Sequence, residues 1–349
     1  MSTLSLTGDR EAGRPWDGPT LGEVLDRAAS DFARHVDEIN RINVFPVPDG
    51  DSGTNMQRTL ASVARAARQA AATGAEAGEL MRQAARAALL GARGNSGVIL
   101  AEIFRGMARQ VAGKAVLRPA DMAEALAAGA EAAYKAVVDP VEGTILTAIR
   151  AAAEATAPFR REAASGMGEL LRVAAEAAHE ATRRTPELLP VLRERGVVDA
   201  AAKGLATFLE AAARQAARVE AGLRPAHPVP AGEGAETPAA AAVLPQATAG
   251  ASPAALYGQE VQLLLESTLE REEVRRRLEA LGDSLLVIGE EGLYRVHIHT
   301  RRTAEVLETC RAMGRTEQET VEDLDEEAAR AEAELHLRPT RREEASGPS

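Results

Sequence analysis

Residues 42–56 read INVFPVPDGDSGTNM, a run in which almost every residue either restricts the backbone or offers an oxygen ligand. Pro46 and Pro48 fix φ and disfavour helix, so the backbone at this point is expected to be extended and stiff. The two glycines allow positive φ and let the main chain approach a ligand. Asp49 and Asp51 then present two carboxylates from one short loop, and hard divalent cations such as Mg²⁺ prefer such oxygen ligands.

Thr54 follows as the expected N-cap of the next helix. Backbone N–H groups at a helix start can receive phosphate, so the loop predicts a site for a metal–nucleotide complex. The alternative is a surface turn, because Pro, Asp, Gly, Ser and Asn are ordinary turn residues. The apolar residues around the aspartates favour a buried loop; they are Ile42, Val44, Phe45 and Val47.

A second loop, residues 91–97, reads GARGNSG and opens directly onto the apolar run from Val98 to Phe104. Three glycines around Asn95 and Ser96 at a helix start form a second candidate anion cradle. A helix C-cap followed by an N-cap needs much the same residue types. The acidic loop and this glycine-rich loop together favour the phosphate interpretation.

Composition limits the class of protein. The chain has 349 residues and 45% hydrophobic content, enough for a large core and two domains. Aromatic residues make up only 3%, and abundant alanine favours closely packed helices over a β-sandwich. A net charge of −11 without a basic patch argues against nucleic-acid binding. One cysteine, no signal-like start and no run of about 20 apolar residues predict a cytoplasmic protein without membrane insertion.

Helical periodicity dominates the first part of the chain. After a stretch expected to be disordered, residues 1–17, we expect an all-helical domain over residues 18–221. About eight helices with polar loops predict an all-α bundle or barrel with a polar mouth. The expected helices cover residues 21–39, 54–72, 75–90, 98 onward, 119–137, 145–155, 166–183 and the segment after Asp199 to 219.

Residues 222–255 contain six prolines and few large apolar residues, which predicts a flexible linker. Beyond it a small α+β domain over residues 256–321 is expected, with βαββα order, followed by a charged tail, residues 322–349, that is helical at first. The expected strands are 256–265, 284–289 and 293–300, and the expected helices are 271–281 and 303–313. His297 and His299 share one strand face and could share a metal ion, but a tetrahedral site needs three or four ligands, so solvent-facing histidines are expected.

With these loops in order, the sequence resembles the fatty acid kinase A family, the DegV-associated kinases with a dihydroxyacetone-kinase-like (DhaL) nucleotide domain. The resemblance covers about residues 18–330. Its motifs are residues 43–56, 91–100 with 103–106, 133–137 with 140–146, and 196–199, then 281–285 and 296–300 in the small domain.

The resemblance implies an eight-helix barrel that binds ATP and Mg²⁺ at its loop end. By position, Asn43, Asp49 and Asp51 would hold Mg²⁺, with both aspartates catalytic, and Asp199 would lie near the nucleotide. The residues that would cradle the phosphates are Thr54, Asn55, Gly94, Asn95, Ser96 and Gly97.

Three departures from the family pattern affect these expectations. The family has a further C-terminal DegV-like domain that this sequence lacks, which concerns partner docking. Ala200–Ala202 stands where the family usually shows Ser-Gly-Gly, and alanine is costly wherever positive φ is needed. A cysteine that joins the two histidines as a metal ligand aligns with Gly258, so a third ligand is expected to be missing.

The resemblance implies an ATP- and Mg²⁺-dependent kinase that phosphorylates a carboxylate. The expected acceptor is a fatty acid held by a DegV-like carrier protein, with an acyl phosphate as product, and a homodimer is possible. Two alternatives stay open. One is a dihydroxyacetone (glycerone) kinase component, although glycerone kinases lack the small domain; the other is a non-catalytic nucleotide-binding regulator.

Overall fold

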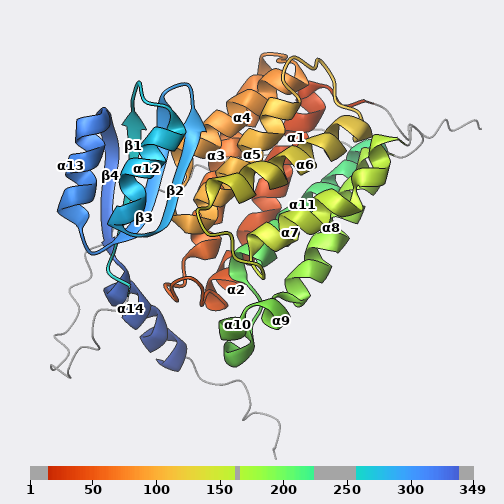
Figure 1. Cartoon of the computed structure of the whole chain (residues 1–349). Helices are drawn as coiled ribbons and strands as arrows, with labels where there is room; N and C mark the ends of the chain where they lie inside the picture. The colour runs from red at the N-terminus through yellow and green to blue at the C-terminus, as the bar shows by residue number, and fades with distance from the viewer. Residues whose placement is uncertain (1–14, 162–165, 224–256, 338–349) are drawn as a thin grey trace, which may run out of the picture.

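The computed structural model describes residues 15–161, 166–223 and 257–337, which form a helical domain and a smaller sheet-containing domain beside it (Figure 1). Three segments with expected properties lie outside the described residues. They are residues 1–14, expected to be disordered, nearly all of the expected linker, and the end of the charged tail. Disorder does not extend to Trp16, which is buried and pairs with Leu117 through two 2.8 Å backbone hydrogen bonds. None of the described helices has the length and apolar character needed to cross a membrane.

Eight long helices build the first domain, as the sequence predicts. They are α1 (Gly18–Phe32), α3 (Ser52–Ala72), α4 (Ala77–Gly91), α5 (Gly94–Gln110), α6 (Pro119–Ala136), α7 (Ile145–Ala155), α8 (Met167–Arg183) and α11 (Ala200–Glu220). Short helices α2 (Val36–Arg41), α9 (Thr185–Leu188) and α10 (Pro190–Arg195) lie between them. The first predicted helix is interrupted: a 3₁₀ turn at Ala33–His35 divides it into α1 and α2.

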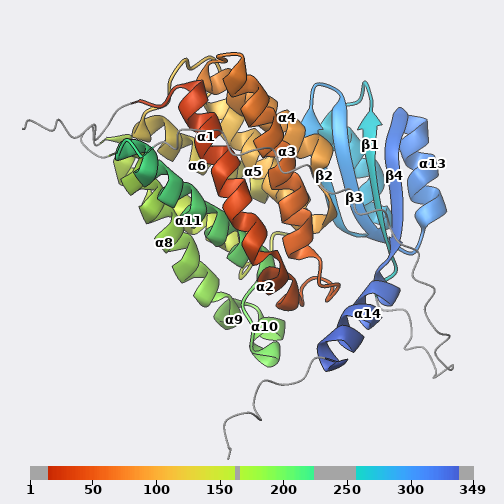
Figure 2. The ribbon, with the colours of Figure 1, turned by 180° about the vertical axis from the view of Figure 1, so that it is seen from behind.

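The eight helices close into a ring. Each packs against the next long helix along the chain, and α11 packs against both α8 and α1, which Figure 2 shows from behind. The ring encloses a core of fully buried side chains such as Phe32, Met56, Leu60 and Leu100. Small residues set the close helix spacing: a Cβ on Gly106 of α5 would lie 2.5 Å from the carbonyl oxygen of Ala128 on α6. The predicted helical barrel is therefore confirmed.

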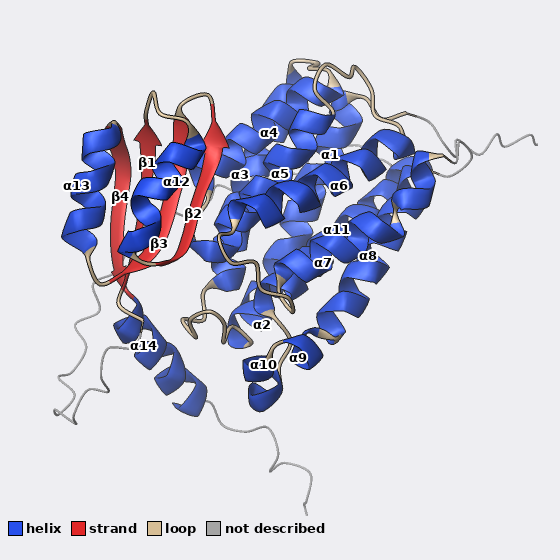
Figure 3. Cartoon of the chain, viewed as in Figure 1, coloured by secondary structure: helices blue, strands red, loops and turns tan. Residues whose placement is uncertain are grey.

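The second domain is a four-stranded antiparallel sheet in the order β2-β3-β1-β4 (Figure 3). Its strands are β1 (Gln259–Glu266), β2 (Asp283–Glu290), β3 (Leu293–Thr300) and β4 (Arg315–Asp323), with α12 (Arg271–Leu278) and α13 (Thr303–Met313) on one face and α14 (Leu324–Leu337) at the end. The predicted βαββα order missed β4. This edge strand is charged and largely exposed, so it carries no apolar alternation for sequence analysis to detect.

The two faces of the sheet have different partners. One packs against α12 and α13 through apolar residues such as Val261, Val296 and Ile298. The other lies against the helical barrel, where Leu286 and Ile288 of β2 join the core of the first domain. The expectation of solvent-facing histidines is therefore wrong: His297 and His299 are on this second face and are buried.

A fully buried arginine joins the two domains. The guanidinium of Arg295 on β3 donates from Nε to the carbonyl oxygen of Leu89 at 3.3 Å and from Nη2 to that of Leu90 at 2.7 Å. These carbonyls belong to the last turn of α4, where a helix lacks its own donors. Burial lowers the pKa of Arg295 to about 9, and the nearby Arg93 adds to the effect.

Replacing Gly106 with alanine is expected to push α5 and α6 apart, since the new Cβ would lie 2.5 Å from Ala128 O and 2.7 Å from Ala132 Cβ. Overpacking costs about 1–3 kcal/mol, more than the gain of about 1 kcal/mol in helix propensity. Urea unfolding should show a lower midpoint for Gly106→Ala. The exposed control on the same helix, Gln110→Ala, should change stability by less than about 0.5 kcal/mol. A Gly106→Ala variant as stable as wild type would contradict the close packing of α5 on α6.

Candidate functional site

The mouth of the barrel holds a cavity of about 120 Å³ that faces the small domain. Seven of the predicted site residues line it: Asn43, Asp49, Asp51, Gly94, Asn95, Ser96 and Asp199. Three do not line it: Thr54, Asn55 and Gly97. The small domain contributes four further lining residues, which are Glu260, Ser284, Leu286 and His299.

Two asparagines hold the acidic loop in place. Asn43 donates from Nδ2 to the carbonyl oxygen of Val47 at 2.7 Å, and its Oδ1 accepts the backbone N–H of Ser52 at 3.0 Å. Asn40 accepts the backbone N–H of Thr54 at 3.1 Å and donates to the hydroxyl of the same residue at 2.9 Å. Asn43 thus has a structural role in the loop, whatever its part in metal binding.

The prediction that Thr54 caps the following helix is wrong. Helix α3 begins at Ser52 with Asp51 in the capping position, so Thr54 lies within the first turn. The side chain of Asn40, from α2, supplies the partner for its backbone N–H instead. Asn40 and Thr54 are fourteen residues apart, so the local Ser-Gly-Thr-Asn pattern does not reveal their contact.

Both aspartates of the loop have raised pKa values. Burial and the charge of Asp51 raise the pKa of Asp49, while burial and the charge of Glu260 raise that of Asp51. Glu327 on α14 also faces this group, and burial with the neighbouring carboxylates raises its pKa to about 7. These carboxylates come from separate elements, and the positively charged side chains near them do not balance their negative charge. Such a group of oxygen donors suits a hard divalent cation such as Mg²⁺.

The second predicted loop becomes the first turn of α5. Gly94 has φ of +58°, and a Cβ there would lie 2.1 Å from Asn55 Nδ2, so only glycine fits. Because the helix starts at Gly94 and not after Gly97, Asn95 and Ser96 occupy its N-terminal turn and line the cavity. A helix N-terminus favours anions, so the predicted cradle has the right geometry.

Two of the predicted phosphate contacts that do not line the cavity lie behind it. Asn55 donates from Nδ2 to Asp51 Oδ2 at 2.5 Å and thereby orients one of the acidic pair. Gly97 lies against α3, where a Cβ would come 2.7 Å from the hydroxyl of Thr59. Both residues support the site from behind its lining.

Asp199 is fully buried at the start of α11. Its Oδ1 accepts the backbone N–H of Ala202 at 2.7 Å, which makes it the N-cap of that helix. Burial raises its pKa to about 7 against the opposing effect of N–H groups at Ala202, Ile145 and Ala201. The alanines from 200 to 202 lie in regular α-helix, where alanine is favoured, so they introduce no backbone strain.

The segment from Val137 to Leu146 lines one side of the cavity, although the sequence predicts no site role for it. Thr144 caps α7 by accepting the backbone N–H of Leu146 at 3.3 Å. The available signal was Gly143-Thr144 at a helix start, a pattern typical of the other site loops.

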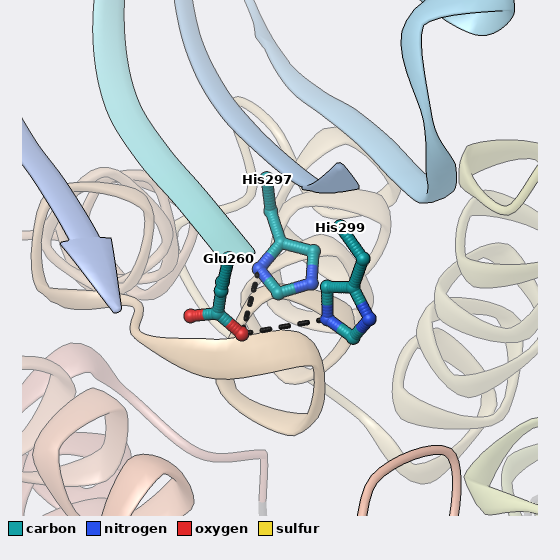
Figure 4. A group of neighbouring side chains, drawn as sticks. All are labelled: Glu260, His297 and His299. Carbon is teal, nitrogen blue, oxygen red and sulfur yellow. Dashed lines mark ion pairs between the residues drawn. The ribbon is translucent and has the colours of Figure 1, made fainter. Parts of the chain in front are cut away.

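A group of three possible metal ligands lies on the sheet face toward the barrel (Figure 4). Oε2 of Glu260 is 3.7 Å from Nδ1 of His297 and 3.5 Å from Nε2 of His299, and all three residues are buried. Neither ring nitrogen of His297, nor Nε2 of His299, has a hydrogen-bond partner among the described residues. The expectation that a third ligand is missing is therefore wrong.

Backbone geometry explains why the third ligand is at 260 and not at 258. Gly258 has φ of +80° and a Cβ there would lie 2.8 Å from Thr300 O, so a cysteine would not fit. Glu260 pairs with His299 across β1 and β3, which puts its side chain on the same face as both histidines.

The three donors suit a cation of the zinc class. Two imidazoles and one carboxylate form a known catalytic zinc set, and bonds of about 2.1 Å place tetrahedral donors roughly 3.4 Å apart. Burial lowers the pKa of His297 to about 4, so its imidazole is neutral at pH 7 and can ligate. Burial raises the pKa of Glu260, but His297 and His299 outweigh it and the net shift is downward, so the carboxylate is ionised.

Asp199→Asn is expected to stabilise the protein more at pH 8 than at pH 5. Because the folded pKa of about 7 exceeds the ordinary value of 3.8, the aspartate's contribution to stability is complete below about pH 4 and is lost as the pH rises through 7. One pKa unit corresponds to about 1.4 kcal/mol, and about two units separate pH 5 from the folded pKa, so the stabilisation by Asp199→Asn should be roughly 3 kcal/mol larger at pH 8 than at pH 5. Urea unfolding at both pH values measures it. The exposed N-cap variant Asp17→Asn should show no such increase, and an equal effect of Asp199→Asn at both pH values would contradict the raised pKa.

Metal-stripped protein is expected to bind one equivalent of zinc, measured by competition with a chromogenic chelator. His297→Ala removes one of three ligands and should weaken binding by about 10-fold or more. His179, which pairs with Glu210 on the barrel surface, provides the matched control His179→Ala, which should bind zinc like wild type. Equal affinity of the His297 variant and wild type would rule out this group as the ligand set.

Comparison with known proteins supports this architecture. Residues 46–214 match the DAK2 domain, and residues 256–331 match the middle domain of fatty acid kinase A-like proteins. Protein YloV of Bacillus subtilis is 35% identical over 321 residues, which cover 90% of this chain and 56% of YloV. The uncharacterized protein SSP1546 of Staphylococcus saprophyticus is 33% identical over 327 residues, with 89% and 56% covered. The chain thus spans little more than half the length of these relatives.

A solved structure, the dihydroxyacetone kinase from C. freundii in complex with AMP-PNP and Mg²⁺, superposes with a TM-score of 0.41 and 17% identity, covering 61% of this chain and 37% of that one. The two matched domains occur in the order that the fold displays, helical barrel first and sheet second. The chain therefore combines a DAK2 domain with a domain that matches the middle domain of fatty acid kinase A-like proteins, in that order along the sequence.

Proposed function

We propose that this protein is an ATP- and Mg²⁺-dependent kinase that transfers the γ-phosphate to a carboxylate. The observation that carries the proposal is the acidic pair Asp49 and Asp51 in the same cavity as the N-terminal turn of α5. One side of the cavity suits a divalent cation and the other suits phosphate. A kinase-type domain match over residues 46–214 supports the same conclusion.

Each group has a definable role in phosphoryl transfer, a reaction that depends mainly on positioning and charge stabilisation. Asp49 and Asp51 hold Mg²⁺, which neutralises phosphate charge when bound, and Asn43 keeps their loop in shape. The N-terminal turn at Asn95 and Ser96 receives phosphate oxygens. Asp199, together with the segment that includes Thr144, lines the remainder of the nucleotide cavity.

A second cavity, of about 310 Å³, lies on the other side of the acidic loop. Asn43, Asp49 and Asp51 line both cavities, and Arg41 and Arg330 line only this second one. In-line transfer requires the acceptor to approach opposite the leaving nucleotide. The second cavity is therefore our choice for the acceptor carboxylate. Its two guanidinium groups can pair with the acceptor, although Asp37 and Glu327 also line it beside the aspartates of the loop.

The acceptor we propose is a fatty acid held by a DegV-like carrier protein, which would yield an acyl phosphate in the cytoplasm. The match of residues 256–331 to a fatty acid kinase A-like middle domain favours this acceptor over dihydroxyacetone. Transfer to a protein-bound acid also fits a cavity that lies beside α14 at the edge of the barrel. A non-catalytic nucleotide-binding regulator is the third possibility that the experiment must separate.

The test incubates the purified chain with Mg²⁺, γ-labelled ATP and a DegV-like carrier loaded with fatty acid, with dihydroxyacetone in a parallel reaction. Labelled acyl phosphate is the expected product. Label in dihydroxyacetone phosphate would replace the proposal with the glycerone kinase reaction. ATP binding without transfer to either acceptor would identify a regulator.

Asp49→Asn and Asp51→Asn are each expected to lower the rate of transfer by about 100-fold or more, because each removes charge that holds the cation. Both variants should unfold at the same or a higher temperature than wild type. The pKa values of Asp49 and Asp51 are raised in the folded protein, so ionisation of these groups lowers the free energy of unfolding, and asparagine cannot ionise. The control Asp26→Asn, on α1 and paired with Arg68, should keep full activity. Near-normal transfer by either site variant would refute the metal assignment.

A further inference from the structure

The small domain places a side chain on the phosphate cradle itself. Oε1 of Gln262, on β1, accepts the backbone N–H of Gly94 at 3.2 Å. Gly94 is the first residue of α5, and its N–H is one of the groups that a helix start leaves without an internal partner. Gln262 is buried, with only 2% of its surface exposed, so the contact is shielded from solvent.

The other end of the Gln262 amide leads to the three-ligand group. Its Nε2 donates to Oε1 of Glu260, and Oε2 of the same carboxylate faces His297 and His299. These two partners fix the orientation of the amide: its nitrogen must face the carboxylate and its oxygen must face Gly94. A continuous chain of polar contacts therefore runs from the imidazoles to the cradle.

Other side chains of the sheet also contact the loop between α4 and α5, so the position of this loop depends on the position of the sheet. Arg295 binds the carbonyl oxygens of Leu89 and Leu90 just before the loop, and Gln318 Oε1 accepts from both Arg295 at 3.0 Å and Arg93 at 3.3 Å. Among these contacts, only Gln262 reaches a backbone N–H of the cradle. It is also the member bonded to a possible metal ligand.

We propose that Gln262 is a positioning residue that couples a zinc-class cation at Glu260, His297 and His299 to nucleotide affinity at the cradle. The inference rests on the proposed nucleotide site. A cation held by Oε2 of Glu260 fixes that carboxylate, leaves Oε1 to accept from Gln262, and keeps the glutamine oxygen on Gly94. Without the cation the carboxylate can rotate, the amide loses its fixed partner and the cradle loses preorganisation.

Such coupling is reciprocal, because two ligands that favour the same arrangement raise each other's affinity by the same factor. Zinc should tighten nucleotide binding, and nucleotide should tighten zinc binding equally. Couplings of this kind usually fall between about 5- and 150-fold. We expect a value near the lower end, since one side chain carries the connection.

The experiment measures the Kd of AMP-PNP with Mg²⁺ by calorimetry, on chelator-stripped protein and on the same protein reloaded with zinc. Wild type should bind the nucleotide about 5-fold more tightly when zinc is present. Gln262→Leu should still take up zinc, measured by chelator competition, but its nucleotide Kd should be the same with and without the metal. Gln262→Met, of similar length, provides a second variant should the first fail to fold.

The matched control is Gln259→Leu on the same strand, whose side chain contacts Thr303 and not the cradle. It should keep the zinc effect in full. An unchanged nucleotide Kd in wild type on zinc loading, failure of wild type to bind zinc, or a full zinc effect in Gln262→Leu would each overturn the coupling. Loss of nucleotide binding in every form would overturn the proposed function, whereas normal binding without a zinc effect would overturn this inference alone.

Discussion

The placement of Asp49 and Asp51 beside each other and near Glu260, with little solvent around them, is the constraint on which the rest of the site depends. The two carboxylates lie in a half-buried loop, and desolvation raises the pKa of each. A fold holds such a pair only if other interactions fix the loop. Side chains of Asn40, Asn43 and Asn55 do so through five hydrogen bonds, anchoring the loop to α3 and orienting one carboxylate. The barrel therefore stabilises an arrangement of carboxylates whose ionised forms a bound cation would stabilise.

Much of this architecture could be predicted from local sequence. The eight long helices follow from apolar spacing, and seven of ten predicted site residues meet in one cavity because their loops all lie at one end of the ring. Polar loops between antiparallel helices return to the same end, so order along the chain implies proximity in space. Glycines near helix starts also identified these loops in the sequence. Gly94 is such a glycine: it begins α5 with a positive φ.

Most of the errors have one physical cause, which is contact between segments far apart in the chain. Thr54 is held by Asn40, and His297 and His299 are buried because a second domain covers their face of the sheet. Glu260 was missed as a candidate ligand because its position beside the histidines depends on strand pairing across β1 and β3. β4 was missed for the opposite reason: as an exposed edge strand it needs few apolar residues.

Arg295 caps the C-terminal end of α4, and this contact affects whether the two domains are independent folding units. The proline-rich run between the domains suggests two independent parts, yet the guanidinium from one part satisfies the carbonyl oxygens of Leu89 and Leu90 in the other. Leu286 and Ile288 likewise belong to the core of the barrel. A truncated barrel would expose an open helix end and an apolar patch together. We therefore expect the two domains to unfold as one cooperative unit, although the sequence composition changes between them.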